Sequence, residues 1–244
     1  MRLAWAHAKA ETLQLVRIPA YALATLAFPV IAVLLFGGRV DDDPERLVAG
    51  FTATAVLAIA FFQFGVGVAT SRLYTEWETF LRTLPTNPST RLAGRVISAL
   101  GFSAVAVVLV GVTAILVYHA HFGWGRLAAL AVALVLGAVP FALLGVAFGY
   151  WLPPRAALPA ANLLFLVLAI LGSLWARPPD DLPREADITS QLLPTRSWVE
   201  VLDSIATGDH RLPLHHVAAL VAWSLVFLAL AWWGYRRDEG ERFT

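Results

Sequence analysis

Six long stretches without a charged residue alternate with polar segments along the chain. Each stretch holds at least 21 residues. A hydrocarbon core about 30 Å thick needs about 20 helical residues to cross it, and a helix satisfies its own backbone hydrogen bonds inside lipid. The pattern therefore predicts six transmembrane helices. We place them at about residues 19–37, 47–71, 96–118, 127–150, 157–175 and 214–234.

Composition supports a membrane protein. Apolar residues make up 59% of the chain and charged residues only 14%, whereas soluble domains carry roughly 25% charged residues. We predict an all-α integral membrane protein, with residues 1–244 forming a single transmembrane domain. There is no cysteine, which excludes disulfides, thiolate nucleophiles and cysteine metal sites.

The distribution of basic residues predicts the orientation. An even number of spans places both termini on one side. With the N-terminus in the cytoplasm, the inner segments hold 11 basic residues and the outer segments 7. Four of those seven lie in the long loop 176–213, and basic residues in short loops have the larger effect on orientation. We therefore expect both termini to be cytoplasmic.

The segment before the first span and the segment after the fifth span both have helical patterns. In residues 1–17, Leu3, Ala6, Ala10, Leu13 and Val16 recur at helical spacing, which predicts an amphipathic helix on the inner membrane surface. An ordinary basic flank that only fixes topology is the alternative. In the outer loop 176–213, the run Ser197–Ala206, closed by Gly208, predicts a short helix packed at the outer surface.

The cytoplasmic segment 72–95 contains a second amphipathic pattern. Trp77, Phe80, Leu81 and Leu84 follow one helical face, and Pro85 ends the pattern. Such a helix between two spans has two plausible roles, since it either rests on lipid headgroups or presents its surface to a partner protein.

Several kinds of chemistry are missing from the sequence. No Asp, Glu, Lys or Arg lies within the predicted spans, which argues against a proton- or sodium-coupled transporter. Neither a G-x-x-x-x-G-K-[ST] nucleotide loop nor the H-E-x-x-H and G-x-S-x-G signatures occur. The histidines near the outer face, His119, His121, His215 and His216, allow a metal site or an intramembrane enzyme as an alternative, although interfacial polar caps are the more common case.

Few polar residues lie inside the spans. Gln63 interrupts an aromatic run, and Asn162 lies in the fifth span. Such groups either hydrogen-bond neighbouring helices or line a pathway. The pair Gly145-x-x-x-Gly149 permits close helix approach.

The layout and several motifs resemble the permease subunits of type-2 ATP-binding cassette (ABC) exporters over essentially the whole chain. The resemblance is strongest at Thr75-Glu76-Trp77-Glu78, followed by Leu81-Arg82 and Pro85. Gly94-Arg95 before the third span and the ending Tyr235-Arg236-Arg237 also match.

The resemblance implies a permease subunit in the bacterial-type cell membrane, paired with a second copy or a related permease and bound to a cytoplasmic ABC ATPase. ATP and Mg would bind the partner, and this chain would hold no cofactor, no metal and no nucleic acid. Coupling to the ATPase would fall to Thr75, Glu76, Trp77, Glu78 and Arg82. The candidate pathway residues are Phe61, Gln63, Phe64 and Asn162.

The expected substrate is amphipathic or apolar, such as a drug, a lipid-like molecule or a peptide, because the spans offer aromatic and aliphatic surface without a counter-charge. A membrane-embedded docking or assembly protein without transport remains the alternative, with the segment 72–95 as its docking surface.

Overall fold

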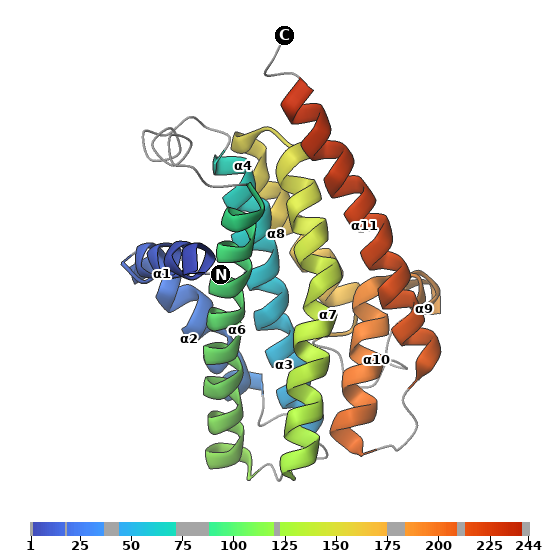
Figure 1. Cartoon of the computed structure of the whole chain (residues 1–244). Coiled ribbons are helices and arrows are strands. Elements are labelled where there is room, and N and C mark those ends of the chain that lie inside the picture. Colours follow the sequence, from blue (N-terminus) through green and yellow to red (C-terminus); the bar gives the residue numbers. More distant parts are fainter. Residues whose placement is uncertain are drawn as a thin grey trace.

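Helices form every secondary-structure element in the part of the chain that the structure describes (Figure 1). The structure is a computed structural model. It describes residues 2–17, 19–36, 44–71, 88–119, 123–174, 184–208 and 213–240. The prediction of an all-α protein is confirmed.

The first helices are α1 (Arg2–Val16), α2 (Pro19–Phe36), α3 (Pro44–Ile59), the π-helix η2 (Ala60–Val66) and α4 (Gly67–Ser71). The chain continues with α6 (Pro88–Tyr118), α7 (Trp124–Trp151), α8 (Pro154–Leu171), α9 (Arg184–Gln191), α10 (Pro194–Thr207) and α11 (Leu214–Gly240).

Five helical segments are long and apolar enough to cross a membrane. The first combines α3, η2 and α4, and the others belong to α6, α7, α8 and α11. The helix α2 contains a shorter apolar stretch, Leu26–Leu35. The five segments are Val48–Thr70, Val96–Tyr118, Trp124–Trp151, Pro154–Leu171 and Leu214–Arg237.

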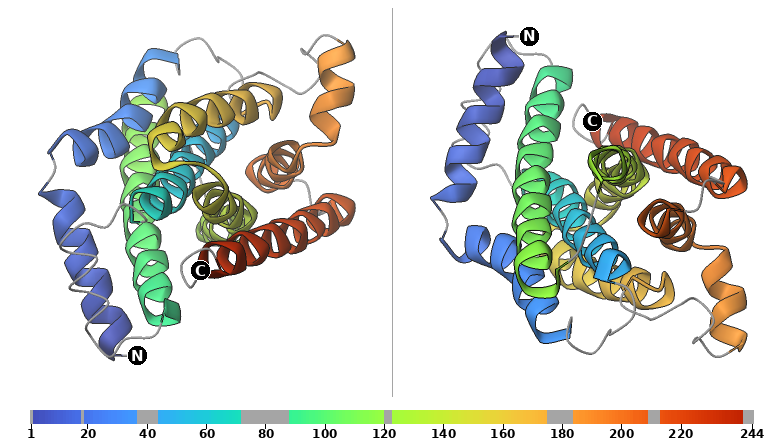
Figure 2. Two further views of the ribbon diagram at one scale, coloured as in Figure 1. Left: turned by 90° about the horizontal axis from the view of Figure 1, so that it is seen from above. Right: turned by 90° about the horizontal axis from the view of Figure 1, so that it is seen from below.

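The helix formed by α3, η2 and α4 is the centre of the bundle. In its most apolar stretch 72% of the residues are buried, against 28% or less in the other four segments. It contacts α2, α6, α7, α8 and α10. The views along the bundle show it enclosed by these helices (Figure 2). Because it is surrounded, any movement of this helix must displace its neighbours.

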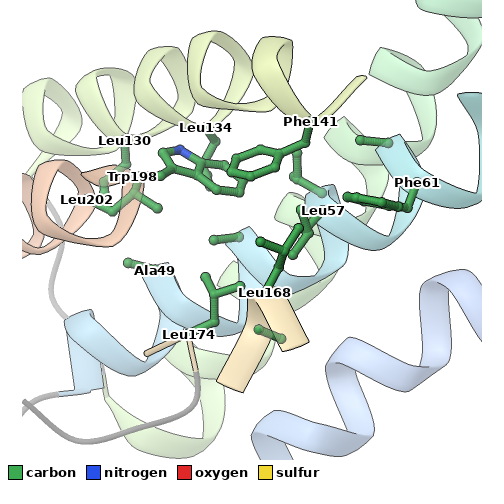
Figure 3. Packing of buried hydrophobic residues seen from close by; sticks show 14 of the residues in the cluster. Ala49, Leu57, Phe61, Leu130, Leu134, Phe141, Leu168, Leu174, Trp198 and Leu202 are labelled. Carbon is green, nitrogen blue, oxygen red and sulfur yellow. The ribbon is translucent and has the colours of Figure 1, made fainter. Parts of the chain in front are cut away.

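The main apolar cluster joins the central helix to α7, α8 and α10 (Figure 3). Its largest fully buried side chains are Trp198, Phe61, Phe141 and Leu57. The rings of Phe141 and Trp198 lie 5.2 Å apart. Aromatic pairs at this separation add to the contact that burial alone provides, so this cluster fixes α10 against the spans.

The outward faces of α6, α8 and α11 are apolar and exposed. Leu116, Leu163 and Leu225 each expose more than 60% of their surface. A soluble monomer rarely exposes contiguous apolar surface of this extent. The exposed side chains therefore suit contact with lipid or with another membrane helix.

The helix α10 includes the predicted helix Ser197–Ala206 and ends at Gly208, whose φ of 77° lies in the left-handed region. It lies beside α7 and α11 in the lower half of the bundle in Figure 1. The predicted face is turned inward, with Trp198 fully buried and Val201 and Leu202 nearly so. The segment between α8 and α11 therefore contributes a helix to the core.

The N-terminal helix α1 lies across the bundle and beside α6 (Figures 1 and 2). Its contact with the bundle uses Ala8, which is buried, and Leu15, which packs on the cluster between the central helix and α6. The apolar positions Leu3 and Leu13 remain exposed. The helix therefore presents one face to the protein and leaves its predicted apolar stripe uncovered by the rest of the chain.

Candidate functional site

The segment that carries the predicted coupling residues is flanked by two helix ends. The helix α4 ends at Ser71 and α6 begins at Pro88, and both ends lie at the upper end of the bundle in Figure 1. The helix α6 runs on from Pro88 as an unbroken helix of 31 residues. Thr75, Glu76, Trp77, Glu78 and Arg82 lie outside the described residues, so their role stays a prediction.

A π-helix stands in the central helix just below this end. The sequence AFFQFGV forms η2, between Ile59 and Gly67, which both have ordinary α-helical φ and ψ angles. The i→i+5 turns of a π-helix are wider than α-helical turns, and they occur frequently at functional sites. Four aromatic or amide side chains follow one another in this wide segment, and they point to different neighbours.

The aromatic residues of η2 contact three different parts of the bundle. Phe61 meets Phe148 of α7 edge-on, with ring centroids 6.4 Å apart. Phe62 lies 6.1 Å from Phe165 of α8. Phe64 belongs to the cluster shared with α6. The aromatic run therefore wedges the π-helix between α6, α7 and α8.

Glycines allow α7 to approach η2 backbone to backbone. A Cβ added at Gly149 would come within 2.7 Å of both the Gly65 carbonyl oxygen and the Val68 Cβ. A Cβ at Gly145 would stand 3.0 Å from the Ala60 carbonyl oxygen. Real Cβ atoms do not pack at the first of these distances, so the Gly145-x-x-x-Gly149 pattern is used here for close helix packing.

The structure places the four predicted pathway residues in two locations. Phe61, Gln63 and Phe64 lie together on η2 and are at least 95% buried inside this protomer. Asn162 lies apart from them on α8, where it is exposed and its Nδ2 donates to the Leu158 carbonyl oxygen at 3.1 Å. The pathway role of these residues stays a prediction.

A buried hydrogen-bonded chain links Gln63 to two residues outside its own helix. The Gln63 Nε2 donates to Ser98 Oγ of α6 at 3.2 Å. Thr12 Oγ1 of α1 donates to the same Ser98 Oγ at 3.0 Å. Sequence reasoning singled out Gln63 but missed Ser98 and Thr12, because isolated hydroxyl residues in apolar helices give no signal of which helix they face.

An ion-pair cluster joins α9 and α10 around the side chain of Arg196. The Arg196 side chain is only 8% exposed, and its Nε lies 2.8 Å from Glu200 Oε1. Its Nη1 lies 3.5 Å from Asp187 Oδ1 and 3.4 Å from Ser173 Oγ. A buried charge of this kind needs its partners, because leaving it unpaired is costly. The cluster therefore ties α9, α10 and the end of α8 together.

The histidines that sequence analysis considered for a metal site are dispersed. The His215 and His216 rings are tilted by 40° with centroids 4.0 Å apart, and His216 Nδ1 lies 3.3 Å from Ser197 Oγ. His119 stands at the end of α6, and His121 lies outside the described residues. Across the described ranges, no group of three or more His, Cys, Asp or Glu side chains is placed to hold a metal ion.

The comparison with known families agrees with this architecture. The model of the ABC-2 type transporter family matches residues 2–206, which include the central helix, η2 and α10. No curated protein matches the chain. Membership implies association with an ATPase subunit and with the membrane. The chain belongs to the ABC-2 type transporter family and is a multi-pass membrane permease of an ABC transporter.

Proposed function

We propose that the chain is the permease subunit of an exporter, and that it moves an amphipathic or apolar molecule out of the cytoplasm. A separate ABC ATPase supplies the energy and holds the ATP and Mg. The observation that carries this proposal is the match to the ABC-2 family across the region that contains the central helix and the predicted coupling segment. The absence of charged residues from the predicted spans supports an apolar or amphipathic substrate.

We propose six spans with both termini in the cytoplasm. Five of them correspond to the helical segments described above, and α2 is the sixth. In Figure 1 the chain descends through α2, ascends through the central helix, descends through α6 and ascends through α7. This alternation supports α2 as the remaining span. The upper end in Figure 1 is then the cytoplasmic side of the cell membrane.

The ATPase docks on the segment 72–95 in this proposal, with contacts from Thr75, Glu76, Trp77, Glu78 and Arg82. A push on this segment reaches the bundle through the end of α4 and the start of α6, since the segment is continuous with both helices. The central helix is enclosed by its neighbours, so its displacement spreads to the spans around it. This arrangement suits a permease that alternates between inward-facing and outward-facing states.

The test is purification of the tagged chain from its host's membranes in mild detergent. We expect a soluble protein with a Walker A loop to co-purify, and Glu78→Arg to release it. Glu185→Arg is the matched control, because Glu185 is an exposed carboxylate on α9 and its reversal should leave the complex intact. Recovery of the chain without any ATPase under several detergents would refute the proposal and favour a docking protein without transport.

A second permease pairs with this one through the exposed face of α8 in this proposal. Asn162 stands on that face among exposed leucines such as Leu163 and Leu166. Because the chain has no cysteine, Asn162→Cys introduces a single thiol. We expect oxidation to cross-link two copies at this position if the assembly is a homodimer, and not at Leu225→Cys on the exposed face of α11. Equal cross-linking at both positions would contradict an α8 interface.

A further inference from the structure

The helices α1 and α6 and the central helix meet at one hydroxyl group. Ser98 lies on α6, is 2% exposed, and accepts hydrogen bonds from Thr12 of α1 and Gln63 of η2. These residues are far apart in the sequence, with separations of 86 and 35 positions from Ser98. The polar chain therefore joins elements that local sequence contacts do not hold together.

The amide of Gln63 is strongly constrained by its surroundings. It is 5% exposed, and its Oε1 has no hydrogen-bond partner in the described part of the protein. An unpaired buried acceptor has already lost its hydration, so the one bond that the amide does make is expensive to break. In surroundings of low polarity that bond is also electrostatically stronger than it would be in water. Ser98 therefore holds Gln63 in a defined place.

The position of Gln63 within η2 makes this restraint important for the second span. The π-helix interrupts the α-helical hydrogen bonding of the central helix over seven residues, and such segments are unusual within α-helices. Five residues after η2 the chain leaves α4 for the segment 72–87. A displacement that enters through α4 therefore reaches η2 first.

The helix α1 needs an attachment of this kind. Few of its side chains are buried, and Leu3, Trp5, Leu13 and Val16 are all at least 45% exposed. It packs along α6, with Ala8 buried and Leu15 on the cluster that α6 shares with the central helix. The hydrogen bond from Thr12, which stands between Ala8 and Leu15 on the same helical face, adds a directional contact to this packing.

We propose that Ser98 is a positioning residue that joins α1 to the second span through Thr12 and Gln63, so that α1, α6 and η2 move as one body during transport. This inference rests on the proposed function, because it describes how a movement begun by the ATPase is distributed. It also gives Gln63 a role inside the protomer, distinct from lining the pathway.

The joined movement is measured with spin labels on the complex with its ATPase in lipid nanodiscs. The absence of native cysteine allows labels at Lys9→Cys on α1 and Thr70→Cys on α4, two exposed positions; we name them the joint pair. A second pair, Thr70→Cys with the exposed Thr207→Cys at the end of α10, reports movement between the two ends of the bundle. Double electron–electron resonance spectroscopy gives the distance distribution of each labelled pair. It is recorded without nucleotide and again after trapping with ATP and vanadate.

In the unaltered permease we expect the joint pair to keep one narrow distance in both states while the second pair changes. Ser98→Ala should split the joint pair into two populations, and because it removes both hydrogen bonds it should lower the ratio of joined to separated molecules at least about fivefold, the change expected from losing one hydrogen bond of ordinary net strength. Thr12→Val should loosen α1 in the same way while the bond from Gln63 to Ser98 remains, and it guards against a folding defect in Ser98→Ala. Ser224→Ala is the control, since that hydroxyl bonds only its own helix backbone at 2.7 Å.

The outcomes separate the two proposals. A joint pair that changes between nucleotide states in the unaltered permease would overturn the inference, as would wild-type distributions in both Ser98→Ala and Thr12→Val. A missing ATPase or an unresponsive second pair would instead overturn the proposed function. The distance distribution of the joint pair, measured in the permease without an ATPase and compared with that of Ser98→Ala, would then still show whether Ser98 holds α1 in place.

Discussion

Replacing Gly137 by alanine tests how α10 is held in the bundle. Gly137 lies on α7, and a Cβ added there would overlap the Trp198 indole. That indole is fully buried, and its Nε1 donates to the Ala133 carbonyl oxygen at 3.0 Å. It also packs against Phe141, so it has no vacant side to move into. One added methyl group must therefore displace the indole and the helix that carries it.

The size of the effect follows from three contributions. Overpacking a tight core costs about 1–3 kcal/mol. Separating the indole N–H from its acceptor leaves a buried donor unpaired, at about 1–3 kcal/mol. Replacing a glycine inside a helix by alanine returns about 1 kcal/mol. The net loss is about 1–5 kcal/mol, and the middle of that range, about 3 kcal/mol, lowers the melting temperature of a chain of this size by about 6–12 °C.

The assay is thermal unfolding of the purified permease in detergent, followed as the loss of the monodisperse peak in size-exclusion chromatography. Gly101→Ala is the matched control, because a Cβ at Gly101 of α6 meets nothing within 4 Å. The control should keep or raise the melting temperature. In the double variant with Trp198→Phe, the smaller ring should relieve the overlap, so Gly137→Ala should cost less there than alone. A melting temperature of Gly137→Ala equal to that of Gly101→Ala would refute the reasoning.

Three further variants extend the test to other contacts. Gly149→Val should abolish folding or lower the melting temperature more than Gly137→Ala does, because the added Cβ would stand 2.7 Å from a carbonyl oxygen of η2; survival at the melting temperature of Gly101→Ala would contradict it. Arg196→Gln should destabilise the protein by about 1–3 kcal/mol, since two partly exposed carboxylates lose their charged hydrogen-bond partner. Arg46→Gln, which removes a more exposed ion pair at 2.7 Å, should cost about 1 kcal/mol or less; equal losses in thermal unfolding would contradict the difference.

Hydrophobicity and helix signals in the sequence give much of the fold. The long apolar stretches predict helices because charge-free runs of that length have few other structures available. The end of α10 at Gly208 follows from the ease with which glycine adopts a positive φ. The inward face of that helix also follows from the spacing of Trp198, Val201 and Leu202. These features depend on local sequence alone.

Which face of a helix packs against which neighbouring helix depends on the rest of the chain. It therefore could not be derived from the local sequence. The apolar stripe of α1 predicts which face lies on the membrane surface, but it does not predict that Ala8 and Leu15 make the contact with the bundle while Leu3 and Leu13 stay exposed. Small side chains permit the closest approach of two helices, and lipid removes the penalty for exposing the large ones. Hydropathy therefore does not say which face meets protein.

The polar contacts of the candidate site were equally hard to foresee. Gln63 stood out as an amide in an aromatic run, but nothing near it in the sequence pointed to Ser98, 35 positions away. Arg196 gives no sign of burial, because only Glu200 is near it in the sequence, while Asp187 and Ser173 come from other parts of the chain. The π-helix also had no signal in the sequence, since its residues have the same apolar character as an ordinary span. Tertiary packing decided all three.

The π-helix has a consequence for insertions and deletions in this chain. An i→i+5 turn holds one residue more than an i→i+4 turn. Removing one residue from Ala60–Val66 would convert the wide turn into an ordinary one and keep both flanking helices in phase. The same deletion elsewhere in the central helix would rotate everything beyond it by about 100°. Gene libraries with single-codon deletions should therefore tolerate loss at this one place in the span, and homologous chains should differ in length there by a single residue.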